Sequence, residues 1–210
     1  MTLPDFSFEL AARANGAGII AGVDEVGRGP LAGPVTAAAV VLDPENIPDG
    51  LNDSKKLTPA RRETLGRLIM QQCDWSVAHV SVEEIDRLNI YHASHLAMCR
   101  AVSGLRQRPD HVLVDGNRIP RDLTVPAEAI VKGDARSLTI AAASIVAKLL
   151  RDCIMVDLAQ QHPGYGWDVN AGYPTPAHKQ ALLDLGVTPH HRRSFRPVHN
   201  ILCKDGTTSN

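Results

Sequence analysis

The chain lacks the features that would place it in a membrane or in a secretory pathway. Among its 210 residues no apolar run approaches the ~18 residues of a membrane-spanning helix. The longest apolar segment, residues 138–150, contains Thr, Ser and Lys, and it predicts a buried helix. Residues 1–16 have no basic start followed by an apolar stretch, so a secretory signal is not indicated. These absences predict a cytoplasmic protein.

The chain also lacks the spacings that are typical of zinc sites and disulfide frameworks. Its four cysteines are far apart and form no C-x-x-C pair, and its nine histidines include no H-E-x-x-H arrangement. In an intracellular protein such cysteines are expected to be reduced thiols that are partly buried. The sequence therefore argues against zinc chemistry.

Net charge gives little guidance, because it is only −1. The distribution of charge is more informative: one basic group lies at residues 55–62, and basic residues outnumber acids five to two after residue 171. Acids that gather at one site can balance a basic surface elsewhere, so a surface that faces phosphate remains compatible with this composition.

The order of the predicted elements favours an α/β fold with a mixed sheet flanked by helices. We predict strands at 18–26, 33–43, 75–81, 110–117 and 127–134, the first two as an antiparallel pair and the fourth as a central strand. Helices are predicted at 59–72, 81–89, 89–106, 137–160 and 175–186, with a partly helical segment from 190 and a loop at 162–175. We expect one catalytic domain over residues 1–210, with a small helical C-terminal lobe from about 175 to 203.

Several carboxylates follow the predicted strands. Asp24 and Glu25 end the first strand, Asp115 ends the central strand, and Asp134 follows the next one. In α/β sheets, catalytic groups gather outside the carboxyl ends of strands. Mg²⁺ prefers hard oxygen ligands, and two such ions can assist the in-line displacement of a phosphoryl group. Each acid alone would be an ordinary turn or capping residue, but the set predicts a divalent-metal site, provided that the strand is distorted enough for Asp24 and Glu25 to share it.

Six short blocks occur in the order GVDEVGRGPLAGPV, LNDSKKL, VDGN, VKGD, AAASIVAK and GYPT, followed by HHRRSF. Together they resemble the bacterial type 2 ribonuclease H family, ribonuclease HII, from about Ala21 to His199. The resemblance implies a ribonuclease-H-like fold, hydrolysis of the RNA strand of RNA–DNA hybrids, and cleavage 5′ of single ribonucleotides embedded in duplex DNA. It also implies two divalent ions, Mg²⁺ or Mn²⁺, at the family's four acids, which fall here on Asp24, Glu25, Asp115 and Asp134.

The resemblance and the residue chemistry also suggest how substrate is bound. In the Gly27-Arg28-Gly29 turn, the missing Cβ atoms would let the backbone approach a sugar-phosphate, and Arg28 can bind phosphate. Tyr173 matches the family tyrosine that packs on or hydrogen-bonds to the ribose at the junction. Lys55 and Lys56 would pair with backbone phosphates or would simply be solvated.

Other aromatic and histidine residues are given structural or surface roles. Tyr165 and Trp167 are expected to be packing residues. His178, His190 and His191 are expected at the surface or against phosphate, because Mg²⁺ disfavours nitrogen ligands. The tail at 204–210 has no aromatic pair of the kind that docks on a sliding clamp, so no such partner is implied, and a monomer is expected.

Three alternatives stay open on the residues alone. The first is another acid-cluster nuclease of the same fold, such as a resolvase, integrase or transposase, which would cut all-DNA strands. The second is a non-catalytic protein that binds hybrid duplexes, against which the complete set of four acids argues. The third is a metal-dependent phosphatase acting on small molecules, which the basic C-terminal segment makes less favourable.

Overall fold

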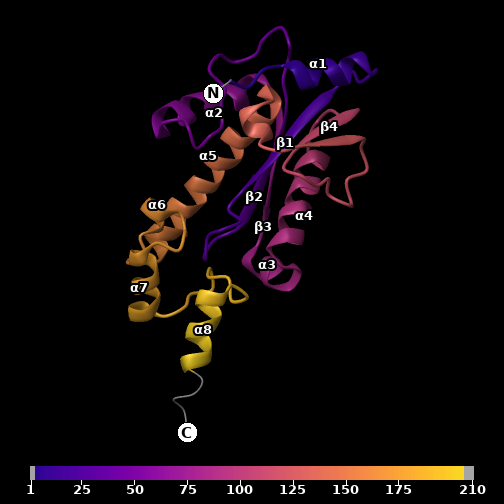
Figure 1. Cartoon of the computed structure of the whole chain (residues 1–210). Coiled ribbons are helices and arrows are strands. Elements are labelled where there is room, and N and C mark those ends of the chain that lie inside the picture. Colours follow the sequence, from indigo (N-terminus) through magenta and orange to yellow (C-terminus); the bar gives the residue numbers. More distant parts are fainter. Residues whose placement is uncertain (1–2, 206–210) are drawn as a thin grey trace. The chain divides into compact units, whose positions relative to one another are not determined.

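The computed structural model describes residues 3–205 and divides the chain into two compact units (Figure 1). The first unit contains the residues up to Val26, Thr36–His79 and Ser94–Leu149. The second contains Gly27–Val35, Val80–Ala93 and the residues from Leu150 onward. The predictions about the tail beyond Asp205 lie outside the described residues.

The first unit is built on a five-stranded sheet in the order β3-β2-β1-β4-β5. Its strands are β1 (Ile20–Val26), β2 (Val35–Val41), β3 (Asp74–Val80), β4 (His111–Asp115) and β5 (Ala127–Ile130). β1 pairs with β2 in the antiparallel sense and with β4 in the parallel sense, and β4 and β5 are also parallel. The prediction of a mixed sheet with an antiparallel first pair is therefore confirmed.

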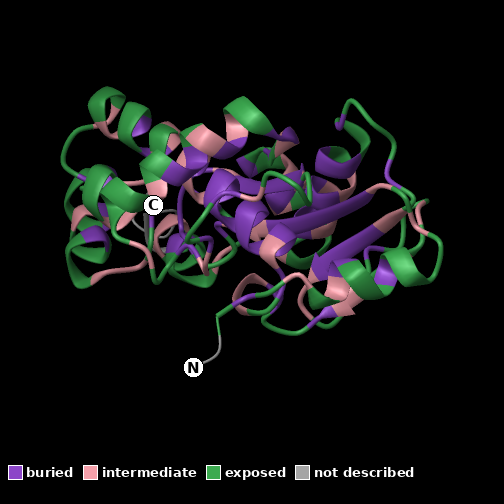
Figure 2. Ribbon diagram, turned by 90° about the horizontal axis from the view of Figure 1, so that it is seen from above, coloured by how far each residue is buried: buried purple, intermediate pink, exposed green. Residues whose placement is uncertain are grey.

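The apolar character of the central strands explains their position. Val112, Leu113 and Val114 of β4 are fully buried, as are Ala37–Ala39 of β2, and Figure 2 shows the strands of the sheet largely in the buried colour. A strand that is apolar on both faces is stable only when both faces are covered. β4 lies between β1 and β5, as its sequence predicts.

The helices are α1 (Ser7–Ala14), α2 (Pro59–Gln72), α3 (Val82–Leu88), α4 (Ile90–Ser103), the 3₁₀ turn η1 (Gly133–Ala135), α5 (Leu138–Gln161), α6 (Trp167–Asn170), α7 (Pro176–Leu185) and α8 (Arg196–Asp205). Three of them begin where capping signals predict. The hydroxyls of Thr58 and Thr175 accept backbone N–H groups at the starts of α2 and α7, each followed by proline. Ser81 and Glu84 form the predicted capping box of α3. Across the described residues, no helix has both the length and the apolar character needed to span a membrane.

The structure differs from the sequence-based expectations at three places. α1 was not predicted, and the expected loop at 162–175 contains the short helix α6. The expected strand at 127–134 ends at Ile130, because Lys132 has φ = 56° and the chain then turns into η1. A left-handed residue cannot continue a strand.

Close packing of α5 on the sheet fixes the start of this helix. A Cβ at Gly22 of β1 would lie 2.5 Å from the Thr139 backbone, so only glycine lets α5 approach so closely. Glu9 of α1 is buried and accepts hydrogen bonds from Ser137 Oγ at 2.5 Å and from the Thr139 N–H at 3.0 Å. α1 thus caps the helix that follows Asp134.

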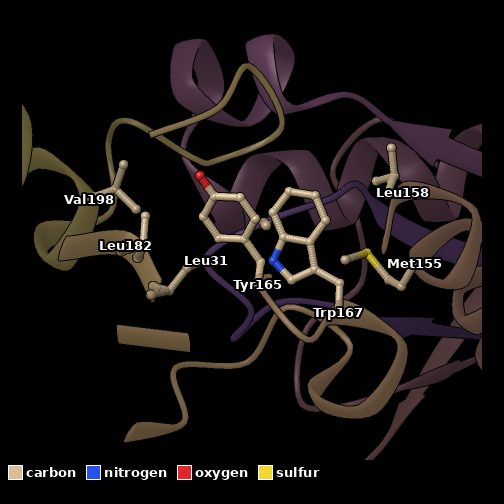
Figure 3. Packing of buried hydrophobic residues seen from close by; sticks show 8 residues of the cluster. Leu31, Met155, Leu158, Tyr165, Trp167, Leu182 and Val198 are labelled. Carbon is tan, nitrogen blue, oxygen red and sulfur yellow. The ribbon is translucent and has the colours of Figure 1, made fainter. Parts of the chain in front are cut away.

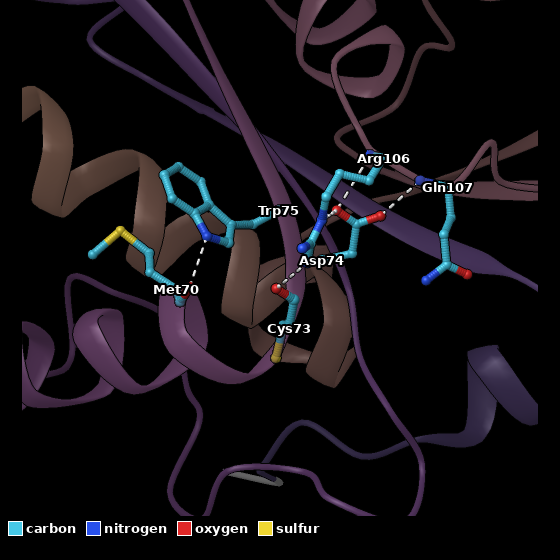
Figure 4. Close-up of polar contacts among 6 residues, drawn as sticks. All are labelled: Met70, Cys73, Asp74, Trp75, Arg106 and Gln107. Carbon is cyan, nitrogen blue, oxygen red and sulfur yellow. Dashed lines mark hydrogen bonds and ion pairs between the residues drawn. The ribbon is translucent and has the colours of Figure 1, made fainter.

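Another buried acid joins the loop after α4 to the start of β3 within the first unit (Figure 4). Asp74 accepts a hydrogen bond from Arg106 Nε at 3.1 Å and from the Gln107 N–H at 2.9 Å. Beside it, burial raises the pKa of the Cys73 thiol to about 11. The four cysteines are thiols, as predicted, although two of them, Cys153 and Cys203, are exposed.

The second unit has its own apolar core, which Figure 3 shows. It contains Trp167, which is fully buried, and Tyr165, whose ring stacks on that of Trp167 with centroids 5.0 Å apart. Leu31, Met155 and other apolar side chains complete the cluster. The prediction that Tyr165 and Trp167 are packing residues is confirmed.

Candidate active site

Three carboxylates meet at the carboxyl ends of β1 and β4. One side-chain oxygen from each of Asp24, Glu25 and Asp115 lies within 4.8 Å of the others. Asp24 is buried, whereas Glu25 and Asp115 are half-buried. The first unit therefore holds the acid cluster that the strand ends predict.

The register of the parallel strands explains this meeting. β1 and β4 pair up to Val23 and Val114, so the next residues, Asp24 and Asp115, lie side by side where this pairing ends, while Asp24 still pairs with β2 and Asp115 with β5. Strict alternation would place Glu25 on the opposite face. Glu25 lies past the last residue that pairs with β4, and one of its carboxylate oxygens nevertheless lies within 4.8 Å of those of Asp24 and Asp115. Its N–H donates to Asp24 Oδ1 at 2.7 Å.

The fourth acid is tied to this cluster through the backbone. The N–H groups of Gly133 and Asp134 donate to Asp115 Oδ1, at 2.6 and 3.4 Å. A Cβ at Gly133 would lie 2.5 Å from Ile140 Cδ1 and 3.2 Å from the same oxygen, so glycine lets this turn pack on α5 and against the Asp115 carboxylate. These bonds fix the Asp115 side chain and place Asp134 beside it.

Electrostatic repulsion among the acids is visible in their pKa values. Burial, together with the charges of Glu25 and Asp115, raises the pKa of Asp24 well above its usual value. The pKa of Asp134 is raised to about 6, by burial first and then by the charges of Asp115 and Asp53. Buried carboxylates that repel one another are stabilised by a bound cation.

A fifth acid, Asp53, was not singled out in the sequence. It hydrogen-bonds to the side chain of Asp134, and its Oδ1 accepts the N–H of Lys55 at 2.9 Å. The positive charge of Lys55 lowers the pKa of Asp134 in turn. Asp53 lies in the block LNDSKKL, one of the blocks that resemble the ribonuclease HII family, so its position could have been predicted from the sequence. Lys55 and Lys56 are both exposed, as their loop position predicts.

The donor set fits hard divalent ions. All of the clustered ligands are carboxylate oxygens, and half-buried Glu25 and Asp115 leave space for water to complete a metal shell. Thiolate and imidazole, which softer metals prefer, are absent from the clusters of potential ligands found in the described part of the chain.

The remaining predicted residues lie together in the second unit. Gly27 is buried at φ = 93°, and a Cβ there would overlap the guanidinium of Arg151. Gly29 is exposed, and a Cβ on it would lie 3.3 Å from Tyr173 Cε1. Tyr173 is itself 39% exposed, and Arg28 is also exposed. The turn and the tyrosine, far apart in the sequence, are thus neighbours.

One expectation about this turn needs correction. The absent Cβ of Gly27 was expected to admit a sugar-phosphate, but that space is occupied by Arg151. Gly27 is required by its positive φ and by this buried guanidinium.

The expected surface position of His178 and His191 is wrong, because both side chains are fully buried. Trp167 Nε1–H donates to His178 Nε2 at 3.0 Å, so the His178 proton is on Nδ1 and is donated to the Tyr173 carbonyl, also at 3.0 Å. His191 accepts the Thr188 N–H on Nδ1 and bonds through Nε2 to His178 at 3.2 Å. Their neighbours in space are apolar, so they are core residues. Their neighbours in the sequence are polar and did not indicate this burial.

Both histidines are neutral in this chain of hydrogen bonds. Burial, followed by the neighbouring histidines, lowers the pKa of His191 to about 3, and burial also lowers the pKa of His178. Together these bonds hold the backbone that carries Tyr173.

Comparison with known proteins gives this geometry a family. The Ribonuclease HII family model matches residues 21–198. The chain belongs to the ribonuclease HII family. It is 74% identical to a Ribonuclease HII from Paracoccus denitrificans over the full length of both chains. It is 67% identical to one from Ruegeria sp., covering 98% of this chain and 90% of that protein.

A solved structure extends the likeness to the fold. The ribonuclease H2 from Pyrococcus horikoshii OT3 superposes with a TM-score of 0.78 at 30% identity, covering 91% of this chain and all of that one. The expected ribonuclease-H-like fold is therefore confirmed. As a ribonuclease HII family member, the protein is an endoribonuclease of the ribonuclease H type that hydrolyses RNA in RNA–DNA hybrids and uses divalent metal ions.

Proposed function

We propose that this enzyme also cuts duplex DNA at a single embedded ribonucleotide, on its 5′ side. The observation that carries the proposal is the pairing of Tyr173 with the exposed Gly29 of the Gly27-Arg28-Gly29 turn. That turn starts three residues after Asp24, and three residues of chain span at most ~11 Å. Chain connectivity alone therefore keeps the first residue of the turn within about 11 Å of the Asp24 Cα atom.

The four acids would hold two divalent ions. Asp24, buried between the other carboxylates, would bridge both ions, with Asp115 and Asp134 each on one side. Glu25 would bind one ion or orient a water molecule. Two bound ions supply an activated water and stabilise the leaving oxygen of an in-line displacement.

In the reaction, the oxygen of a water molecule forms a bond to phosphorus and the bond from phosphorus to the 3′ oxygen breaks. The products are a 3′-hydroxyl and a 5′-phosphate. The carboxylates would hold the ions that position the attacking water and the phosphate, and the Gly133 and Asp134 N–H groups hold the Asp115 side chain in place.

Recognition would depend on the turn and on Tyr173. The 2′-hydroxyl is the group that distinguishes RNA from DNA, and a site that hydrogen-bonds it rejects the analogue that lacks it. The turn would meet that hydroxyl and the adjoining phosphate, while the Tyr173 ring would pack on the sugar of the next nucleotide. Arg28, Lys55 and Lys56, all exposed, would bind backbone phosphates.

A panel of three duplexes tests the proposal: one with a single ribonucleotide, one RNA–DNA hybrid, and one all-DNA duplex, each with Mg²⁺ or Mn²⁺. We expect cleavage of the first two and not of the third. Cleavage of the all-DNA duplex would favour a resolvase-like nuclease, and binding of all three without cleavage would favour a non-catalytic protein. Activity on the hybrid alone would refute the proposal while leaving the family's activity intact. That the enzyme is a cytoplasmic monomer and acts in ribonucleotide removal stays a prediction.

A further inference from the structure

Two arginine side chains, Arg151 and Arg192, are fully buried in the second unit. Arg151 is on α5, and Arg192 lies between α7 and α8. A buried guanidinium is costly unless its N–H groups are satisfied, and proteins usually meet this need with a carboxylate. Every hydrogen bond described for these two side chains ends instead on a backbone carbonyl oxygen.

The carbonyls belong mostly to the Gly27–Val35 segment, which contains the recognition turn. Arg192 Nη2 donates to Gly27 O at 2.6 Å, Nη1 to Arg28 O at 3.1 Å, and Nε to Gly33 O at 3.0 Å. Arg151 donates to Pro34 O at 2.9 Å and to Ala32 O at 3.2 Å. The two guanidiniums therefore hold the segment from both of its ends.

Arg151 also links this segment to the chain that carries Tyr173. Its Nη1 donates to Ala171 O at 3.0 Å, and the N–H of Leu31 donates to Gly172 O at 2.7 Å. The same guanidinium thus joins the Gly27–Val35 segment, at Ala32 and Pro34, to the residues that lead directly into Tyr173.

The direction of these carbonyls has a consequence for the opposite side of each peptide plane. No peptide bond in the described chain is cis, and in a trans peptide the C=O and the following N–H point in opposite directions. With the carbonyls of Gly27 and Arg28 turned toward Arg192, the N–H groups of Arg28 and Gly29 point away from it. Both residues are exposed, so this side of the two peptide planes belongs to an exposed part of the turn.

We propose that Arg192 and Arg151 are positioning residues for substrate recognition: they turn the carbonyls of the recognition segment inward and so aim its N–H groups at the ribonucleotide. Successive backbone N–H groups directed outward form an anion-binding arrangement, and the guanidinium behind them adds positive charge. Charge-assisted hydrogen bonds are shorter and stronger than neutral ones, which keeps the segment rigid. This inference rests on the proposed function, because it concerns the same recognition site.

Lysine is the informative replacement at both positions. It keeps the positive charge but cannot donate to three carbonyls with a planar fork. We therefore compare Arg192→Lys and Arg151→Lys with Arg87→Lys, an exposed arginine on α3 of the same unit. In Ca²⁺, which should allow binding without efficient turnover, affinity is measured for a duplex with one ribonucleotide and for the same duplex in DNA.

The readout is the ratio of the two affinities. A merely structural defect lowers the folded fraction and reduces both affinities alike, so it leaves their ratio unchanged. In Arg192→Lys, we expect the affinity for the ribonucleotide duplex relative to that for the DNA duplex to be about fivefold or more below its wild-type value. Fivefold is the factor that corresponds to one lost hydrogen bond. Arg87→Lys should leave the ratio unchanged. A folded Arg192→Lys variant with the wild-type ratio would overturn the proposal.

A second measurement uses the wild-type protein and so does not depend on how well the variants fold. Amide hydrogen exchange at Arg28 and Gly29 should slow when the ribonucleotide duplex binds in Ca²⁺, and should slow less with the all-DNA duplex. Equal protection by both duplexes, or none by either, would contradict the inference. If the wild-type protein neither prefers nor cuts at a single ribonucleotide, the proposed function itself fails, and that result is distinguishable from a failure of the variants alone.

Discussion

Replacing Asp24 by asparagine removes one charge from the centre of the acid cluster while keeping the shape of the side chain. Asparagine Oδ1 can still accept the Glu25 N–H, which Asp24 Oδ1 accepts at 2.7 Å. Core packing is therefore preserved. The change alters the electrostatics of the cluster and its capacity to bind cations, which makes it a specific probe of the site.

The substitution should have two effects: it should lower the rate of cleavage and raise the stability of the metal-free protein. Loss of a metal ligand should reduce cleavage by more than about 100-fold, since even groups that only support a ligand typically contribute 10–100-fold. Without metal the protein should become more stable. Two unit charges 4.8 Å apart repel by about 3.5 kcal/mol at an effective dielectric constant of about 20. Loss of the Asp24 charge should recover part of this repulsion, an expected gain of about 1–3 kcal/mol.

The assays are single-turnover cleavage of an RNA–DNA hybrid and thermal unfolding at pH 8 in a chelator. Each kcal/mol should raise the unfolding midpoint by about 2–4 °C in a protein of this size. Asp184→Asn is the matched control, because Asp184 is exposed on α7 and its described bond is to Gln180 on the same helix. A variant that retains a tenth of the wild-type rate would refute the bridging role of Asp24, and a lower unfolding midpoint without metal would refute the repulsion.

Three further predictions concern pH, phosphate binding and the ribose. Because the pKa of Asp134 is raised to about 6, this group stabilises the metal-free fold most below its usual pKa near 3.8 and loses that contribution as pH rises through 6. Mn²⁺ should therefore raise the unfolding midpoint more at pH 7.5 than at pH 5. An equal rise at the two pH values would contradict this prediction. Lys55→Ala with Lys56→Ala should weaken binding to all duplexes alike and lower the salt dependence by about two phosphate contacts, whereas a loss on one substrate only would mean another role. Tyr173→Ala should lose at least about tenfold more activity on a single-ribonucleotide duplex than on a uniform hybrid, with Tyr173→Phe separating the hydroxyl from the ring; equal losses would make Tyr173 a packing residue.

The sequence predicts the acid cluster well because its signals are local. Strand ends, helix caps and glycines are read from neighbouring residues, and the parallel pairing of β1 and β4 then brings Asp24 and Asp115 together. Asp53 escaped notice because its contact with Asp134 joins segments about 80 residues apart, and no local pattern reports such a contact.

The second unit was predicted less well, for a physical reason. Its buried polar groups, Arg151, Arg192, His178 and His191, look like surface residues in a sequence, because burial of charged or titratable groups is rare without partners. Their partners here are mostly backbone carbonyls, which every residue carries and which leave no trace in the sequence. Only the fold shows that the two arginines hydrogen-bond to the carbonyls of the Gly27–Val35 segment.

The most direct test of the account is to map the cut in a duplex that carries one ribonucleotide, beside the same duplex with a 2′-deoxy nucleotide at that position. With Mg²⁺ or Mn²⁺ we predict one cut, at the phosphodiester 5′ of the ribonucleotide, with 3′-hydroxyl and 5′-phosphate ends, and no cut in the deoxy duplex. Cleavage of both duplexes, or a cut on the 3′ side of the ribonucleotide, would contradict the account.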